Sequence, residues 1–144
     1  MRCLQLAALN TPQLVRIDQV VDVHKVGRPQ IVKVVHHLGR CGFLETVRGR
    51  NGGFRLAKPA EDISVGEVVR LTEGDLDLVE CFNPETNRCV LLGVCQLSST
   101  LKEATAAFMR VLDQTSVADI ARNKDQLLER ISWVDRSKDT EDMK

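Results

Sequence analysis

Three cysteines lie within fifteen residues, in the spacing Cys81-x7-Cys89-x5-Cys95, and they are the side chains of this chain best suited to bind a metal. Pro84 and Gly93 interrupt the segment, which has no helical or strand periodicity, so no regular backbone forces the thiols apart. Thiolates bind iron–sulfur clusters, zinc or copper(I), and thiols also pair or react with oxidants. Structural zinc sites usually have four protein ligands with Cys-x-x-Cys pairs, and a cluster also needs about four ligands. Spacing alone therefore leaves a cluster, zinc and free thiols as alternatives.

The other two cysteines, Cys3 and Cys41, are interpreted as small buried hydrophobic residues. An odd number of cysteines does not indicate a disulfide framework. The longest uncharged apolar stretch, residues 90–97, is too short to cross a bilayer, and no signal-peptide cleavage site follows the apolar start of the chain. We expect a cytoplasmic protein with no membrane partner.

A basic group of residues surrounds the dipeptide Asn51-Gly52. Arg48, Arg50 and Arg55 flank it and two further glycines, between short apolar segments. Asn-Gly favours tight hairpin turns because both residues tolerate positive φ. The sequence predicts a hairpin with strands over 43–47 and 54–56. Its thin, arginine-rich tip could approach phosphates or enter a minor groove.

Two short amphipathic helices are predicted before this hairpin, over 15–24 and 29–38, joined by a turn at Gly27. The second helix is predicted to bury Ile31, Val34, Val35 and Leu38. The polar residues left outside are Arg28, Gln30, Lys33, His36 and His37. Arg and Gln at the start of such a helix can contact guanine and adenine bidentately, and Lys suits phosphate. Adjacent histidines on a helix point in different directions, so DNA contacts are favoured over a shared metal.

Two helices followed by a hairpin are typical of a winged helix-turn-helix. The predicted fold is mainly α with a small β-hairpin wing and a later long helix that begins near 97–100. Ser64 and Glu67 match a capping box that starts a helix to about Leu71. We expect a DNA-binding domain over 1–72, a loop that carries the three clustered cysteines over 73–96, a long-helix region over 97–130 and a flexible tail over 131–144.

The charge distribution agrees with a DNA partner. Residues 1–60 contain ten Lys and Arg against three acids, a net +7, and residues 61–144 contain ten against seventeen, a net −7. A polyanion would dock on the basic half. No Ser/His/Asp grouping, phosphate loop or paired-carboxylate motif points to an enzyme.

Several runs resemble one family of regulators. They are Gln30–Gly39, Gly42–Ala57, Ile63-x-x-Gly66-Glu67-Val68-Val69-Arg70, Leu78–Phe82, Asn87-x-Cys89, Cys95-x-Leu97 and Ala118-Asp119. Together they resemble the NsrR-type nitric-oxide-responsive repressors, which share a superfamily with the iron–sulfur regulator IscR. The resemblance extends over roughly residues 2–120.

This resemblance implies a homodimer on double-stranded operator DNA, with the long helix packed against its mate. It implies a cluster, usually 4Fe–4S, on Cys81, Cys89 and Cys95, and release from the operator when nitric oxide attacks the cluster. It also implies a fourth ligand, a carboxylate from the other subunit on a segment preceding the position of Met1. The seven-residue gap between Cys81 and Cys89 is longer than the four or five that the family suggests.

Two alternatives stay open at this point. The first keeps DNA binding but senses iron or cluster status with a 2Fe–2S cluster. The second is a metal-carrying protein that binds no DNA, and the arginine- and glycine-rich hairpin weighs against it.

Overall fold

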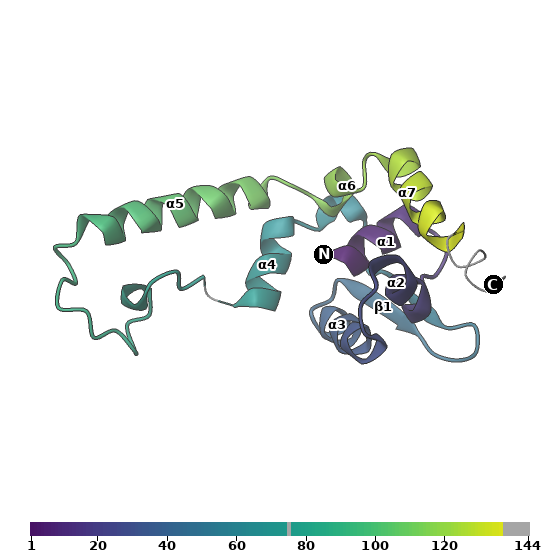
Figure 1. Cartoon of the computed structure of the whole chain (residues 1–144), viewed down its shortest axis with the longest axis horizontal. Coiled ribbons are helices and arrows are strands. Elements are labelled where there is room, and N and C mark those ends of the chain that lie inside the picture. Colours follow the sequence, from purple (N-terminus) through teal and green to yellow (C-terminus); the bar gives the residue numbers. More distant parts are fainter. Residues whose placement is uncertain (75, 137–144) are drawn as a thin grey trace. The chain divides into compact units, whose positions relative to one another are not determined.

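The computed structural model describes residues 1–74 and 76–136, with side chains as far as Ile131. The described chain forms two compact units: residues 1–63 with 116–136 (unit 1), and residues 64–115 (unit 2). Its elements, labelled in Figure 1 where there is room, are α1 (Arg2–Asn10), α2 (Ile17–His24), α3 (Arg28–Arg40), β1 (Leu44–Val47), β2 (Gly53–Leu56), η1 (Ala60–Asp62), α4 (Val65–Glu73), η2 (Glu80–Phe82), α5 (Gln96–Asp113), α6 (Val117–Ile120) and α7 (Lys124–Arg136). The predicted mainly helical fold with one two-stranded hairpin is confirmed.

Unit 1 has the continuous apolar core. Phe43 and Phe54 are fully buried at its centre, together with Leu4 of α1, Val20 of α2 and Leu38 of α3. α1 packs on β2, and α3 packs on both α2 and β1. Each helix therefore buries one apolar stripe and leaves its polar face outside, as a helix that packs on one side does.

The helix-turn-helix differs locally from the sequence-based prediction. α3 buries Ile31, Val35 and Leu38 as predicted, but Val34 is 37% exposed. In the turn between α2 and α3, the residue with a left-handed conformation is Lys25, with φ 52°. Gly27 is instead the N-cap of α3.

The end of α3 also differs from the prediction. The helix continues through Gly39 to Arg40, and the left-handed glycine is Gly42, with φ 78°. Gly39 lies close to β1, since a Cβ on it would stand 3.6 Å from the carbonyl oxygen of Leu44. That distance is an ordinary van der Waals contact, so the packing on β1 does not itself require glycine here.

The wing is an antiparallel pair in which Glu45 faces Arg55 and Thr46 faces Phe54. The positive φ in its tip falls at Gly49, with φ 113°, and among the described residues Asn51 does not share that conformation, so the predicted Asn-Gly turn is wrong in detail. The amide of Gly52 donates to the carbonyl of Gly49 at 2.9 Å and closes the tip.

The base of the wing is tied to the segment before α2. Val15 and Phe54 exchange two backbone hydrogen bonds, both 2.9 Å long. A Cβ at Gly53 would lie 2.5 Å from the carbonyl oxygen of Val15, so this strand start requires glycine for the close approach.

In unit 2, α4 packs against α5. The Ser64 hydroxyl accepts a hydrogen bond from the Glu67 amide at 3.3 Å, which is one of the two hydrogen bonds of the predicted capping box. Arg70 of α4 and Asp113 of α5 form a two-pronged ion pair, with N–O distances of 2.6 and 2.7 Å, which holds the pKa of the Asp113 carboxyl below its usual value.

The two compact units are a division by packing, and the predicted functional regions over 1–72, 73–96 and 97–130 stay predictions. α4 packs within unit 2, and α6 and α7 belong to unit 1. α7 extends to Arg136, so the first part of the predicted tail over 131–144 is helical. Residues 137–144 lie outside the described residues.

Candidate nucleic-acid interface and cysteine segment

All the residues predicted to contact DNA are exposed, in contrast to the buried apolar stripe of α3. They are Arg28, Gln30, Lys33, His36 and His37 on α3, and Arg48, Arg50, Asn51 and Arg55 on the wing. Arg28 is the first residue of α3, and Pro29 follows it in the first turn. Pro in that position fixes φ and needs no amide partner, so the start of the helix has a defined backbone.

A hollow of about 350 Å³ lies between α2, α3 and the wing. Three arginines line it: Arg16 before α2, Arg28 on α3 and Arg50 at the wing tip. Such a concave basic surface between a recognition helix and a wing suits the phosphate-lined edge of a DNA groove.

Two of the arginines predicted to contact DNA form ion pairs with acidic side chains, and neither acid was predicted from the sequence. The Arg28 Nε donates to Asp18 Oδ1 at 2.8 Å, and the Arg55 Nε donates to Glu45 Oε2 at 2.9 Å. Glu45 could have been found from the hairpin register, because it faces Arg55 across the strands. Asp18 could not, because its pairing depends on how α2 packs on α3.

Arg48 and Arg50 differ from these two arginines. Neither has an ion-pair partner among the residues that the structure describes. Their positive charges are therefore not compensated by an acid of the described chain, so the wing tip offers two available cationic groups.

Cys81, Cys89 and Cys95 are all free and half-buried. Cys81 lies in η2, Cys89 follows an irregular turn, and Cys95 is the N-cap residue of α5. Across the described residues, no three His, Cys, Asp or Glu side chains stand close enough together to hold a metal ion. The segment thus supplies three thiols on non-repetitive backbone, but this conformation does not gather them.

Local hydrogen bonds shape the segment around these thiols. The Asn83 Oδ1 accepts from the Glu85 amide at 3.0 Å, and the Asn87 Oδ1 accepts from the Cys89 amide at 2.9 Å. An Asn two residues before the amide that it binds is a turn signal readable in the sequence, although these turns were not among the predicted elements. Ser98 in the first turn of α5 contacts Cys81, with 3.3 Å between Sγ and Oγ. That contact spans seventeen residues, so no local pattern predicts it.

The two remaining cysteines differ from each other. Cys3 is 3% exposed, and burial raises the pKa of its thiol, which confirms the interpretation as a small core residue. The same interpretation of Cys41 is wrong, because Cys41 is half-buried at the end of α3, with its Sγ 3.8 Å from His37 Nε2.

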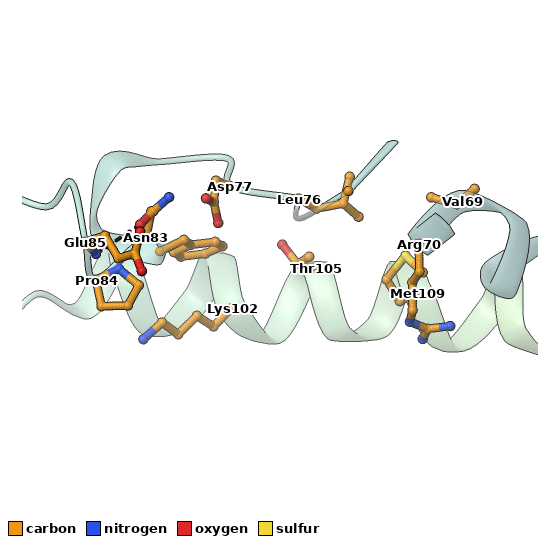
Figure 2. A pocket seen from close by; sticks show the side chains of 12 residues that line it. Val69, Arg70, Leu76, Asp77, Asn83, Pro84, Glu85, Lys102, Thr105 and Met109 are labelled. Atoms are coloured by element: carbon orange, nitrogen blue, oxygen red, sulfur yellow. Dashed lines mark hydrogen bonds between the residues drawn. The ribbon is translucent and has the colours of Figure 1, made fainter. Parts of the chain in front are cut away.

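A groove of about 720 Å³ lies in unit 2 between α5 and the segment that carries Cys81 (Figure 2). Lys102, Thr105 and Met109 line it from α5, and Asp77 and Asn83 lie opposite them in the close-up. The ammonium of Lys102 stands 5.8 Å from the centre of the Phe82 ring, next to Cys81. This groove mixes both charge signs with apolar side chains and belongs to the same unit as the cysteines.

α5 has no buried residue, although it is amphipathic. Leu97, Phe108 and Val111 form an apolar stripe on one side of it and are 63, 54 and 62% exposed. Among the described residues, no helix is both long and apolar enough to cross a membrane.

Comparison with known proteins agrees with this arrangement. The profile of the Rrf2 family, described as an iron-dependent transcriptional regulator, matches residues 1–123. The chain belongs to the Rrf2 family. It is therefore a DNA-binding transcriptional regulator with a winged-helix fold.

Among curated relatives, this Rrf2 chain is similar to the HTH-type transcriptional regulator NsrR of Shouchella clausii, with 48% identity over 86% of this chain and 83% of the relative. It is 42% identical to NsrR of Bacillus subtilis, over 85% of this chain and 84% of the relative.

Solved structures agree on the Rrf2 fold. CymR, described as the global cysteine regulator of B. subtilis, aligns with a TM-score of 0.66 and 21% identity over 83% of this chain and 87% of that chain. IscR of T. potens aligns with a TM-score of 0.66 and 19% identity, covering 85% of this chain and 80% of that chain. At these identities the likeness is one of fold.

Proposed function

We propose that this regulator is a repressor whose operator binding is controlled by a nitric-oxide-sensitive iron–sulfur cluster, held by Cys81, Cys89 and Cys95. The observation that carries the proposal is the set of three free, half-buried thiols on one non-repetitive segment that ends at the start of α5. Support also comes from the curated relatives named NsrR and from the iron-dependent description of the family.

The chemistry of the donor set fits such a cluster. Cysteine thiolates are its usual ligands, and all three cysteines are unpaired and partly accessible. The segment from 83 to 94 consists of turns and irregular backbone, so the thiols can approach one another without unfolding a helix or strand. A bound cluster, proposed as 4Fe–4S, would supply iron that nitric oxide attacks.

The chain's own residues would couple that site to the rest of unit 2. Cys95 is the N-cap of α5, and Cys81 contacts Ser98 one turn later. Coordination of the three cysteines as thiolates would release the three thiol protons, and it would fix the backbone between 81 and 95 relative to the first turn of α5.

The exposed stripe of α5 supports a homodimer. Leu97, Phe108 and Val111 would be covered by the same helix of a second copy. Two copies would present two α3 helices, and such dimers bind half-sites about one DNA turn apart.

On each half-site we propose that Arg28 and Gln30 read base edges from the start of α3. Lys33, His36 and His37 would contact phosphates. Arg48, Arg50, Asn51 and Arg55 of the wing would contact phosphates or an adjacent minor groove. The exposure of all these side chains supports this assignment.

The test is to purify the full chain without oxygen, count iron and sulfide, and record the visible spectrum and operator affinity before and after nitric oxide. We expect a broad visible band that bleaches together with loss of DNA binding. Replacement of Cys81, Cys89 or Cys95 by Ser should abolish the band. Cys41→Ser, a half-buried cysteine outside the segment, should retain it.

Three outcomes would contradict the proposal. Stoichiometric zinc, or no metal after anaerobic reconstitution with iron and sulfide, would remove the sensing mechanism and leave a winged-helix DNA binder. Two iron atoms and two sulfides per protomer, with binding insensitive to nitric oxide, would instead favour a sensor of iron or cluster status.

A further inference from the structure

The first residue of the recognition helix is held by an acid from the helix before it. Asp18 lies in the first turn of α2, and its Oδ1 accepts from the Nε of Arg28, the first residue of α3, at 2.8 Å. α2 and α3 pack against each other in unit 1 (Figure 1), which brings these two helix starts together. The pair borders the basic hollow between α2, α3 and the wing.

This ion pair contributes little to the stability of the fold. The two side chains are 61 and 68% exposed, and ion pairs in that setting are weakened by water and salt. Its consequence concerns the conformation of Arg28, because a long side chain that would otherwise sample many rotamers is held in one direction.

The geometry leaves the two terminal nitrogens of the Arg28 guanidinium available to a second partner. Asp18 takes only the Nε of Arg28, whereas Asp113 occupies both terminal nitrogens of Arg70. The Nη1 and Nη2 groups of Arg28 therefore keep donors for a second partner. A guanine presents two acceptors, O6 and N7, to such donors in the major groove.

We propose that Asp18 is a specificity-determining positioning residue that holds Arg28 ready to read a guanine. This inference rests on the proposed base contact of Arg28. The carboxylate also faces the surface where phosphates would lie, so it lowers affinity for every DNA sequence alike. Asp18 thus weakens non-specific binding and strengthens discrimination at the same time.

The test uses the full chain, purified without oxygen. Wild-type protein selects binding sites from a random duplex library, and fluorescence anisotropy then gives the Kd for a selected site and for a scrambled one at the same salt. The variants are Asp18→Asn, Asp18→Glu and Arg28→Ala. Asp62→Asn, which removes one exposed carboxylate from η1, is the charge-matched control.

We expect Asp18→Asn to bind the scrambled duplex as tightly as the wild type or more tightly. The specific-to-scrambled ratio should fall by about 3- to 10-fold per half-site, the usual effect of ordering one long side chain on binding. Asp18→Glu should restore part of the ratio, because it retains a carboxylate acceptor. Asp62→Asn should leave the ratio unchanged. Circular dichroism checks that each variant is folded.

Equal tightening of both duplexes by Asp18→Asn would overturn the proposal, since it would make Asp18 only a repulsive charge. If Arg28→Ala keeps the full ratio, the base contact of Arg28 itself is wrong, and this outcome is separate from the first. If Arg28→Ala loses the ratio while Asp18→Asn keeps it, Arg28 reads the base without help from Asp18. A wild type that selects no sequence would refute both.

Discussion

The wing arginines differ in how far their charge is compensated, and this difference predicts the salt dependence of DNA binding. Arg48 and Arg50 are exposed and have no ion-pair partner among the described residues, whereas Arg55 is paired with Glu45 at 2.9 Å. Replacing Arg48 or Arg50 by Ala should remove a full phosphate contact. Replacing Arg55 should remove less, because Glu45 already compensates part of its charge in the wild type.

The magnitude follows from counterion release. Each phosphate contact contributes about 0.9 to the slope of log K against log salt, so the Arg48/Arg50 double substitution should reduce the slope by about 1.8 per protomer. Over a fourfold change in salt, from about 50 to about 200 mM, that slope corresponds to roughly a 12-fold change in affinity per protomer. Arg55→Ala should reduce this slope by less than about 0.9 per protomer.

The assay is fluorescence anisotropy with one duplex at four or more salt concentrations. Arg130→Ala, which removes an exposed arginine of α7 outside the helix-turn-helix and wing, is the charge-matched control. Glu45→Gln removes the negative charge that compensates Arg55, so it should increase the slope. Identical slopes for the wild type and the double variant, or equal losses from Arg48, Arg55 and the control, would refute this role of the wing.

Three further predictions concern the fold and the cysteine segment. Gly53→Ala would place a methyl group 2.5 Å from a backbone carbonyl oxygen before α2, so unfolding in urea should show a loss of about 1–3 kcal/mol, and an unchanged midpoint would contradict this packing. Hydrogen bonds from the amide and hydroxyl of Ser116 lower the pKa of Asp119 below its usual 3.8. The stability that these bonds provide is complete above pH 3.8 and is lost as the pH falls through the lowered pKa. In urea titrations, the stability advantage of the wild type over Asp119→Asn should therefore disappear in acid. Ser98→Ala removes the contact partner of the Cys81 thiol at 3.3 Å, so alkylation of that thiol in metal-free protein should become faster. Ser99→Ala is the control and should leave the rate unchanged. Equal rates in both variants would show that the contact does not protect the thiol.

Periodicity predicted the helices of unit 1 well, because their burial is dictated by one packed face. Ile31, Val35 and Leu38 repeat at helical spacing and are buried. Val34 is next to a core position, but it lies about a quarter of a turn away and is partly exposed. The apolar character of a residue did not by itself decide its burial at the margin of the stripe.

Turn chemistry was less predictable. Gly27 and Asn51 are the residue types that usually adopt positive φ, yet Lys25 and Gly49 adopt it. Gly39 lies inside α3 and does not end it, and the left-handed glycine after the helix is Gly42. These roles depend on how neighbouring elements pack, which a single sequence does not display.

In the candidate sites too, the local sequence predicts some residues, while others depend on how elements pack. The spacing of the cysteines predicts a donor set, whereas the contact between Cys81 and Ser98 joins residues on different elements and has no local signal. The pairing of Asp18 with Arg28 likewise depends on two helix starts meeting in space. Local sequence identified the groups able to do chemistry, and tertiary packing supplied the residues that position them.

The arrangement separates two contributions to DNA binding within one surface. Arginines without acidic partners among the described residues provide charge at the wing tip, which every DNA sequence attracts equally. Arg28 is neutralised in part by Asp18 and loses attraction for phosphate, but it gains a defined direction. If Arg28 reads a base as proposed, a chain with a net charge of zero can bind DNA without excessive non-specific affinity, because Asp18 lies beside that arginine and the wing tip keeps its charge. The proposed regulation through Cys81, Cys89 and Cys95 acts in the other compact unit, so it can change how two copies are presented to an operator while these charges stay as they are.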